Sequence, residues 1–280
     1  MRIDLCGTRG STPAPGRDFV RYGGHTSCLA ITPDGATVPE LLLDAGTGIR
    51  AVTGLLAGRP YNGTIALTHL HWDHTQGLPF FGAGDRDDAT VRLLLPEPGE
   101  SRGAEAALER GMSPPSFPIT PRGLLGHWTF TGLEPGELRL GSLTLTAREI
   151  PHQGGRTFGY RVSDGRNAVA YLPDHCPTDL GPGPAGLGVY HDAALELADG
   201  ADVLMHDAFW TAEELDLRRT FGHAAAEYAV GLAVHARAAR VLLLHHRPDR
   251  TDIELDKIAA RFAGSVVPVH LAADGEAICL

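Results

Sequence analysis

The sequence predicts an α/β protein in which two mixed β-sheets are sandwiched between helices, an αββα arrangement formed by one domain over residues 1–280. Short apolar strands dominate the first half of the chain, and strands alternate with helices in the C-terminal half. No internal repeat is present, which argues against a solenoid or a propeller. With 280 residues, of which 43% are hydrophobic, the chain has ample material for a core.

Runs of β-branched and apolar residues between turn residues predict the strands. We expect strands at Arg2–Cys6, Ser27–Thr32, Glu40–Leu43, Gly63–Leu67, Thr90–Leu95, His127–Thr131, Ser142–Ile150, Thr157–Val162, Asn167–Leu172, Val203–Met205, Arg240–Leu244 and Val266–Leu271. Apolar residues at helical spacing predict the helices. We expect helices from Gly48 to about Gly58 and at Thr75–Phe81, Ala104–Arg110, Gly188–Ala198, Ala224–Ala236 and Ile253–Phe262. The proline-rich segment 113–121 cannot form regular structure, and we expect a rigid connection there rather than a lid.

Composition excludes several classes of function. A net charge of −10 argues against a general nucleic-acid or membrane surface. The four cysteines are far apart and form no Cys-x-x-Cys pair, so neither a disulfide framework nor a zinc knuckle is expected. The first residues do not resemble a signal peptide, and no apolar run is long enough to span a bilayer. We therefore expect a cytoplasmic protein.

One short stretch concentrates side chains that bind metals. His69, His71, Asp73 and His74 follow directly after the strand expected at Gly63–Leu67. The strand therefore presents them at its C-terminal end, where α/β sheets place their sites. This spacing allows two imidazoles to converge on one ion while the aspartate and the last histidine face a second ion.

Three further donors occupy the same kind of position in distant parts of the chain. His152, Asp174 and His245 each come just after an expected apolar strand, and this repeated placement predicts that they converge. His246 is the rival of His245, but neighbouring side chains of an extended strand point in opposite directions, so only one is expected to bind a metal. We favour His245 because it is the first residue beyond the apolar run. Asp44, at another strand end, is either a partner of a ligand histidine or a helix cap.

The string His-Leu-His-Trp-Asp-His at 69–74 resembles the signature of the metallo-β-lactamase superfamily, a group of mostly two-metal hydrolases. The resemblance implies the metallo-β-lactamase fold. It also implies that one ion is held by His69, His71 and His152, that the other is held by Asp73, His74 and His245, and that Asp174 bridges them. The string does not select a reaction, because thioesterases, lactamases and nucleases share it.

Two later motifs resemble the phosphodiesterase branch of this superfamily, which includes tRNA 3′-processing nucleases and cyclic-phosphate phosphodiesterases. Residues 204–209, Leu-Met-His-Asp-Ala-Phe, resemble its acidic motif, and residues 221–227 resemble its Gly-His-Ser-Thr motif, with two alanines in place of Ser and Thr. The resemblance implies that His223 protonates the leaving oxygen or holds the phosphate, close to a helix N-terminus that favours anions. Asp207 is expected to orient a nearby imidazole. Asp73, Asp207 and His223 are therefore the expected catalytic residues.

These motifs together predict a binuclear metal-dependent phosphodiesterase that uses a metal-activated hydroxide. Zinc is the expected metal, and manganese or iron also suits a set of nitrogen and oxygen donors. In the branch that the chain resembles, the bacterial tRNA-processing enzymes carry a long tRNA-binding arm. In this chain the interval between His152 and Asp174 has room for only two short strands. A small cyclic or nucleotide phosphodiester is therefore favoured over nucleic acid. Trp72, Phe209 and Trp210 are candidates for a base or sugar pocket, although aromatic side chains belong more often to the core.

Other functions remain open at this point. Within the same class, the alternative is a tRNA 3′-processing endoribonuclease. An acyl hydrolase of the lactamase or thioesterase type would not need the motif at His223, and a non-catalytic binding module would not need all seven ligands. The resemblance also implies a homodimer, because members of this branch often form dimers.

Overall fold

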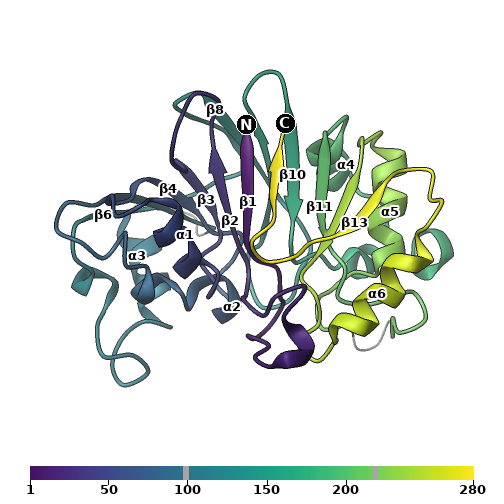
Figure 1. The fold of residues 1–280 in the computed structure, drawn as a ribbon, viewed down its shortest axis with the longest axis horizontal. Helices are drawn as coiled ribbons and strands as arrows, with labels where there is room; N and C mark the ends of the chain where they lie inside the picture. The colour runs from purple at the N-terminus through teal and green to yellow at the C-terminus, as the bar shows by residue number, and fades with distance from the viewer. Residues whose placement is uncertain (97–100, 217–219) are drawn as a thin grey trace.

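The computed structural model describes residues 1–96, 101–216 and 220–280, and these residues form two β-sheets packed face to face between helices (Figure 1). The first sheet has seven strands within the described residues, in the order β14-β1-β2-β3-β4-β5-β6. Its strands are β1 (Arg2–Gly7), β2 (Cys28–Thr32), β3 (Leu41–Leu43), β4 (Asn62–Ala66), β5 (Thr90–Leu95), β6 (His127–Gly132) and β14 (Ala277–Cys279).

The second sheet also has seven strands in the described part of the chain, in the order β13-β12-β11-β10-β9-β8-β7. Its strands are β7 (Gly136–Leu140), β8 (Leu143–Glu149), β9 (Phe158–Ser163), β10 (Ala168–Leu172), β11 (Val203–Asp207), β12 (Val241–Leu244) and β13 (Val269–Leu271). Both sheets mix parallel and antiparallel neighbours. The predicted fold class is therefore confirmed.

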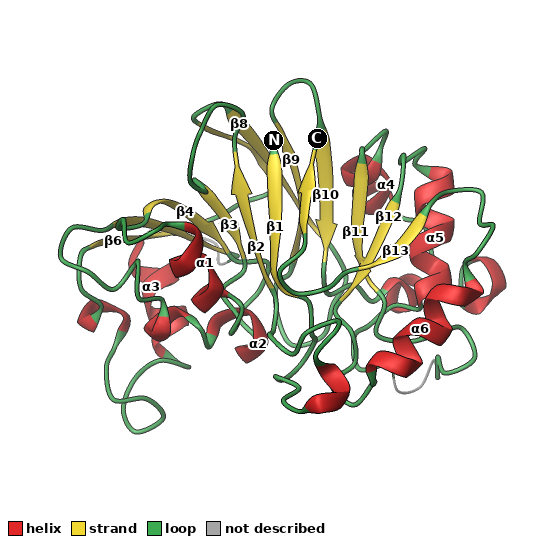
Figure 2. Ribbon diagram, in the orientation of Figure 1, coloured by secondary structure: helices red, strands yellow, loops and turns green. Residues whose placement is uncertain are grey.

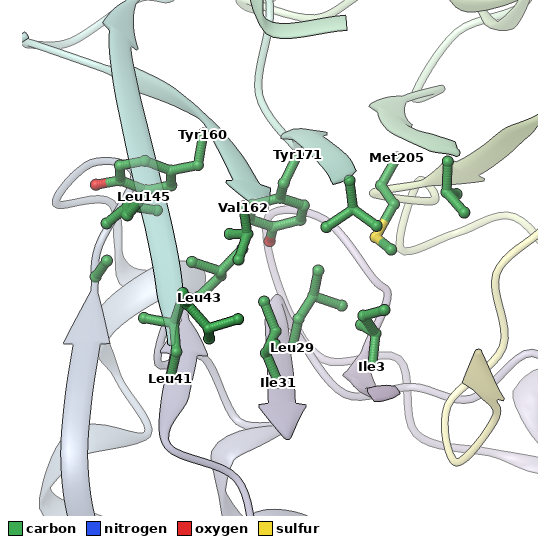
Figure 3. Close-up of a cluster of buried hydrophobic side chains, with 14 of the residues drawn as sticks. Ile3, Leu29, Ile31, Leu41, Leu43, Leu145, Tyr160, Val162, Tyr171 and Met205 are labelled. Atoms are coloured by element: carbon green, nitrogen blue, oxygen red, sulfur yellow. The ribbon is translucent and has the colours of Figure 1, made fainter. Parts of the chain in front are cut away.

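The main hydrophobic core lies between the two sheets. Side chains of a strand alternate between its two faces, so Leu29 and Ile31 of β2 point inward while Ala30 between them points outward. Figure 3 shows Leu29 and Ile31 packed in the inner layer with Val162 and Tyr171 of the second sheet. All four side chains are almost completely buried, and this burial fixes how the sheets face each other.

Helices cover both outer faces of the sandwich (Figure 2). The helices are α1 (Ile49–Leu55), α2 (Trp72–Thr75), α3 (Ser101–Glu109), α4 (Asp192–Ala198), α5 (Ala226–His235) and α6 (Asp252–Arg261), with short 3₁₀ turns η1 (Arg17–Phe19), η2 (Leu78–Phe80), η3 (Pro121–Gly123), η4 (Pro177–Leu180) and η5 (Pro184–Gly186). Helices α1 and α3 pack on the outer face of the first sheet, and α4, α5 and α6 pack on the second. Among the described residues, none of these helices has the length and apolar character needed to cross a bilayer.

Strand direction brings the ends of distant strands to one edge of the molecule. Strand β9 is antiparallel to both β8 and β10, so β8 and β10 run in the same direction, and β10, β11 and β12 are parallel neighbours. The C-terminal ends of β8, β10 and β12 therefore lie along the same side of the second sheet. The end of β4 reaches this side from the first sheet, where the carbonyl of Thr68 accepts a hydrogen bond of 2.8 Å from the backbone of Phe158.

Some predicted elements were wrong in extent. The helix expected at Thr75–Phe81 is instead α2, which begins within the metal-binding stretch, followed by the separate turn η2. Pro79 in that turn has no backbone N–H for a continuous helix. Strands β7 and β14 were not predicted, and the helix expected from Ala224 begins at Ala226.

Candidate metal centre

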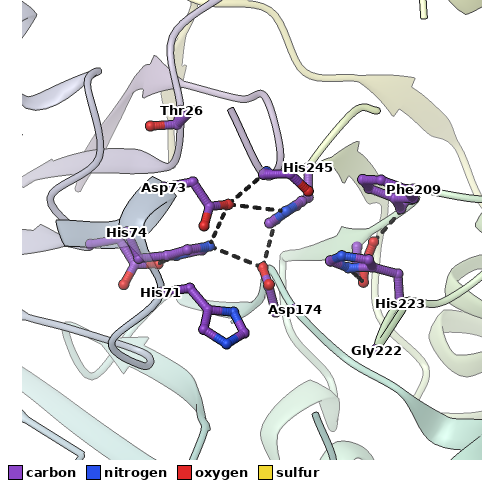
Figure 4. A network of polar contacts seen from close by, with 12 residues as sticks. Thr26, His71, Asp73, His74, Asp174, Phe209, Gly222, His223 and His245 are labelled. Atoms are coloured by element: carbon purple, nitrogen blue, oxygen red, sulfur yellow. Dashed lines mark hydrogen bonds and ion pairs between the residues drawn. The ribbon is translucent and has the colours of Figure 1, made fainter. Parts of the chain in front are cut away.

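The predicted donors come together at the edge where the strands end. His69 lies just beyond β4, and α2 places Asp73 and His74 directly behind it. His152 follows the end of β8, Asp174 follows β10, and His245 follows β12. Figure 4 shows His71, Asp73, His74, Asp174 and His245 pointing toward one another.

The donors form two groups that share one carboxylate. The first group is His69, His71, His152 and Asp174, and the second is Asp73, His74, Asp174 and His245. Within each group the ligand atoms lie within 4.8 Å of one another. All seven sequence-predicted ligands are thus gathered in one place, with Asp174 in the shared position.

Unpaired polar atoms in these groups fit metal binding. Nε2 of His69, Nε2 of His74, both ring nitrogens of His245 and Oδ1 of Asp174 are buried and form no hydrogen bond among the described residues. The nitrogens instead face the carboxylates of Asp73 and Asp174 at 2.6–3.5 Å. Buried polar atoms are otherwise almost always paired. Ring nitrogens and carboxylate oxygens in this arrangement are the donors that zinc, manganese and iron accept. The residues therefore fit two divalent cations.

Neighbouring groups orient the histidines. Asp44 is fully buried, and its Oδ2 lies 2.8 Å from Nδ1 of His74. Because a carboxylate can only accept, Nδ1 carries a hydrogen, so Nε2 is the nitrogen that faces the second group and could bind a cation. In the same way, Nδ1 of His152 donates to the carbonyl of Gly222 at 2.7 Å, which leaves Nε2 for the first group. Asp44 is thus a partner of a histidine, one of the two roles considered from the sequence.

The electrostatics of the second group favour a cation. Burial opposes ionisation of Asp73, but the facing His74 and His245 hold the pKa of this carboxyl well below its usual range. Burial also opposes protonation of His74, but Asp73, Asp44 and Asp174 raise the pKa of this imidazole well above its usual range. The group thus contains ionised carboxylates in a buried place, and positive charge there is stabilised.

His245, rather than His246, lies in the donor group, although the geometry is not that of an extended strand. His245 adopts a left-handed backbone conformation with φ of 57°, directly after β12. Nε2 of His246 instead donates to the carbonyl of Ala272 at 2.8 Å. Gly10 packs tightly against the His245 ring, because a Cβ there would lie 1.9 Å from its Cδ2 atom. The N-terminal loop therefore helps to position this histidine.

The two remaining predicted catalytic residues form a pair beside the donor groups. Nδ1 of His223 lies 3.0 Å from Oδ2 of Asp207, and the His223 ring is stacked on Phe209 with centroids 4.2 Å apart. The His223 ring lies 5.0 Å from that of His245, between centroids. Oδ2 of Asp207 also accepts from the backbone N–H of Ala224 at 3.1 Å. The backbone N–H of Ala224 at this turn therefore helps to hold the Asp207 carboxylate in place.

A cavity of about 500 Å³ opens over the metal centre. It is lined by His71, Asp73, His152, Asp174 and His223, and also by Ser11, Leu70, Trp72, Phe209 and Phe221. Trp72 and Phe209, two of the three aromatic candidates for a pocket, therefore line it. Trp210 does not line it, and its indole N–H donates to the carbonyl of Thr220 at 2.8 Å.

Sequence reasoning missed a chain of three histidines behind Asp207. Nδ1 of His206 donates to the backbone carbonyl of Asp207 at 2.8 Å, so its Nε2 accepts from Nδ1 of His175 at 2.9 Å. Nε2 of His175 in turn accepts from Nε2 of His191 at 2.8 Å. The backbone N–H of His175 donates to Oδ2 of Asp207 at 3.2 Å. This chain supports Asp207 from behind, and no spacing in the sequence indicates that these histidines meet.

Comparisons with known proteins agree with this geometry. A family model described as a beta-lactamase superfamily domain matches residues 40–246. Ribonuclease Z of Natronomonas pharaonis is 24% identical, over 98% of this chain and 92% of its own length.

Solved structures share the fold. YhfI from Bacillus subtilis, a metallo-beta-lactamase fold protein, gives a TM-score of 0.70 at 18% identity and covers 99% of both chains. A diphosphatase from the PhnP family gives 0.67 at 18% identity, over 100% of this chain and 97% of its own. The short form of human tRNase Z gives a TM-score of 0.65 at 21% identity, over 100% of this chain and 99% of its own.

Proposed function

The chain belongs to the beta-lactamase superfamily and is a metal-dependent hydrolase; from this premise we propose that it is a two-metal phosphodiesterase acting on a small cyclic or nucleotide phosphodiester. The pairing of His223 with Asp207 on the wall of the cavity that both donor groups line carries the proposal. An acyl hydrolase that needs only activated water has no use for a buried histidine–carboxylate pair at this place. A phosphodiesterase needs an acid for the departing alkoxide.

Each residue of the site has a role in this proposal. His69, His71 and His152 would hold one cation, Asp73, His74 and His245 the other, and Asp174 both. When bound, two such cations lower the pKa of water and offset negative charge on the phosphate.

The acid in this proposal is His223. Its Nδ1–H donates to Asp207, so Nε2 is the nitrogen that would give a proton to the leaving oxygen. Asp207 holds the ring orientation and stabilises the charged imidazolium. Phe209 stacks on one face of the ring and limits its rotation.

The segment between His152 and Asp174 is short, which supports a small substrate. That segment forms only β9, β10 and their connections, and all of its residues are described. It leaves no room for the long arm that resemblance associates with bacterial tRNA-processing enzymes. The net charge of −10 also disfavours a polyanion that must contact many surface positions. Both observations support a small substrate.

A tRNA 3′-processing endoribonuclease is the second candidate. It is supported by relatives named ribonuclease Z that match over nearly their whole length, such as the protein of Natronomonas pharaonis. A short arm elsewhere or a partner protein would then have to supply the contacts to tRNA. The two candidates share the site and differ in the size of the substrate.

The test uses purified, zinc-loaded protein with four substrates: bis(p-nitrophenyl) phosphate, a thioester, a cephalosporin and precursor tRNA. We expect that only the phosphodiester is hydrolysed. A panel of 2′,3′- and 3′,5′-cyclic nucleotides then identifies which class of cyclic phosphodiester is the substrate. On a cyclic nucleotide, whose leaving group is an alkoxide that needs a proton, His223→Gln should lose the activity, whereas His127→Gln, a matched change of an exposed histidine on β6, should retain it. Cleavage of precursor tRNA at its 3′ end would favour the second candidate, and hydrolysis of the thioester or cephalosporin would overturn both.

A further inference from the structure

A second cavity adjoins the metal centre. It has a volume of about 870 Å³ and shares Leu70 and Trp72 with the cavity over the metal centre. Its other walls come from α1, from η2 and from the segment that follows α3, including Phe80 and Phe117. We refer to it as the side cavity. The two cavities are therefore neighbours that meet at Leu70 and Trp72.

Two aromatic side chains of the side cavity, Trp72 and Phe80, are exposed, and Phe80 packs edge-to-face on Phe117 with ring centroids 6.0 Å apart. Trp72 is 75% exposed and Phe80 is 60% exposed, which is unusual for such large apolar groups. The indole N–H groups of Trp128 and Trp210 donate to backbone carbonyls. The N–H of Trp72, by contrast, has no hydrogen-bond partner among the described residues. Trp72 thus offers both a flat face and a free donor at the junction of the two cavities.

One unpaired cation belongs to the same cavity. Arg50 of α1 is exposed and lines the side cavity, and within the described part of the chain its guanidinium has no ion pair. Thr47 and Gln76 lie on the same wall. Guanidinium, amide and hydroxyl groups beside aromatic faces recognise a heteroaromatic ring through its edge and its face together. An alkyl chain would use the apolar walls but none of these polar groups.

We propose that the side cavity binds the nucleobase of a nucleotide phosphodiester whose phosphate lies at the metal centre. This inference rests on the proposed function and names its substrate class. Trp72 and Phe80 provide the stacking surface, and Arg50 binds acceptor atoms on the edge of the base. The volume lies within the range of pockets for small ligands and exceeds what a bare phosphate ester needs.

A binding measurement tests the side cavity independently of catalysis. Adenosine, which carries no phosphate, is titrated into the zinc-loaded full chain by isothermal calorimetry. Trp72→Ala should weaken its binding about 5- to 100-fold, the range that stacking of a base on an aromatic ring contributes. Met112→Trp places a larger side chain in the lining of the side cavity and should weaken binding similarly. Val266→Trp adds the same side chain at a position that is 92% exposed, and should leave binding unchanged.

A kinetic comparison then connects the cavity to the substrate. The p-nitrophenyl ester of thymidine 5′-phosphate and ethyl p-nitrophenyl phosphate have the same leaving group, but the first carries a nucleoside where the second carries an ethyl group. The ratio of their kcat/KM values should favour the nucleotide ester at least about tenfold and should fall toward one in Met112→Trp.

The outcomes are distinct. If adenosine does not bind, or binds to Trp72→Ala and Met112→Trp as tightly as to the wild type, the inference is overturned. Binding of octyl phosphate that depends on Met112, with no binding of adenosine, overturns it in favour of an alkyl group. If adenosine binds as expected and neither ester is hydrolysed, the side cavity stands and the proposed function fails.

Discussion

Replacing Asp44 with asparagine should selectively weaken the second metal group, because it changes which nitrogen of His74 carries the hydrogen. Oδ1 of Asp44 accepts from the backbone N–H of Thr68 at 2.7 Å, and this donor cannot be reversed. The amide oxygen of asparagine must therefore face Thr68, and its NH₂ group must face Nδ1 of His74. That nitrogen then has to accept, so that Nε2 becomes protonated and cannot bind a metal.

The magnitude follows from the contact that is lost. A hydrogen bond of 2.8 Å between His74 and a carboxylate contributes about 1.5–3 kcal/mol. Partners of ligand histidines typically change metal affinity by about 10- to 100-fold, which corresponds to about 1.4–2.8 kcal/mol. Asparagine also tolerates the left-handed backbone of Asp44, whose φ is 62°. The fold should therefore persist while one metal is lost.

The assay is competition with a chelator of known affinity, combined with elemental analysis of metal per chain. The wild type should bind two equivalents of zinc with similar affinity, whereas Asp44→Asn should hold one tightly and the other about 10- to 100-fold more weakly. Tyr171→Phe is the matched control, because it removes another donor to the same Oδ2 atom, at 3.0 Å, without changing the tautomer of His74. Equal affinities in Asp44→Asn and the wild type would refute this explanation of Asp44.

Further predictions concern the acid, the packing around the site and the buried histidines. His223→Ala should lower kcat about 10²- to 10⁴-fold while metal content by elemental analysis stays at the wild-type value; full activity in this variant would remove the acid role. Gly10→Ala should reduce the zinc content, because the added Cβ would lie 1.9 Å from the ring of His245. Gly54→Ala is the control and should not, because a Cβ there has no atom within 4 Å. Retention of both zinc ions in Gly10→Ala would contradict this packing. Burial lowers the pKa of His206 below its ordinary value of 6.5. As the pH falls, the unfolded chain therefore takes up the proton before the folded chain does. The contribution of His206 to the free energy of unfolding is thus present above about pH 6.5 and is lost as the pH falls below that value. This is measured by denaturant titrations with chelator between pH 7 and pH 5. The slope of the unfolding free energy against pH should be smaller in His206→Gln than in the wild type, by up to about 1.4 kcal/mol per pH unit. An unchanged slope would show that this histidine does not contribute.

The sequence could predict that the seven candidate donors converge because each of them follows an apolar strand. His152, Asp174 and His245 are ordinary residues in isolation, and only their repeated position at strand ends suggested that they meet. The directions of β8, β10 and β12 explain why that reasoning succeeded, since all three strands run the same way in the second sheet. Whether the donors hold two ions stays a prediction until metal is measured.

Other features could not be read from the chain because they depend on tertiary contacts. The contact of His175 with His206 joins residues at the ends of β10 and β11, and neither has a neighbour in sequence that indicates it. Strand β14 is short and gains its pairing only from β1. The interruption between α2 and η2 was missed because helical apolar spacing continues through a proline.

The distribution of the donors between the sheets has a consequence for folding. Each donor group combines residues that follow β4 of the first sheet with residues that follow strands of the second, so neither group can form within one sheet. A cation bound by either group therefore stabilises only the arrangement in which the two sheets are packed face to face. Because an unfolded chain does not preform such a site, the free energy of metal binding adds to the stability of that packing. The four donors after β4 lie close together in sequence and supply one part of each donor group. The three donors from the second sheet complete these groups only when that sheet is packed against the first. Metal affinity and the core between the sheets are thus coupled properties of the same structure.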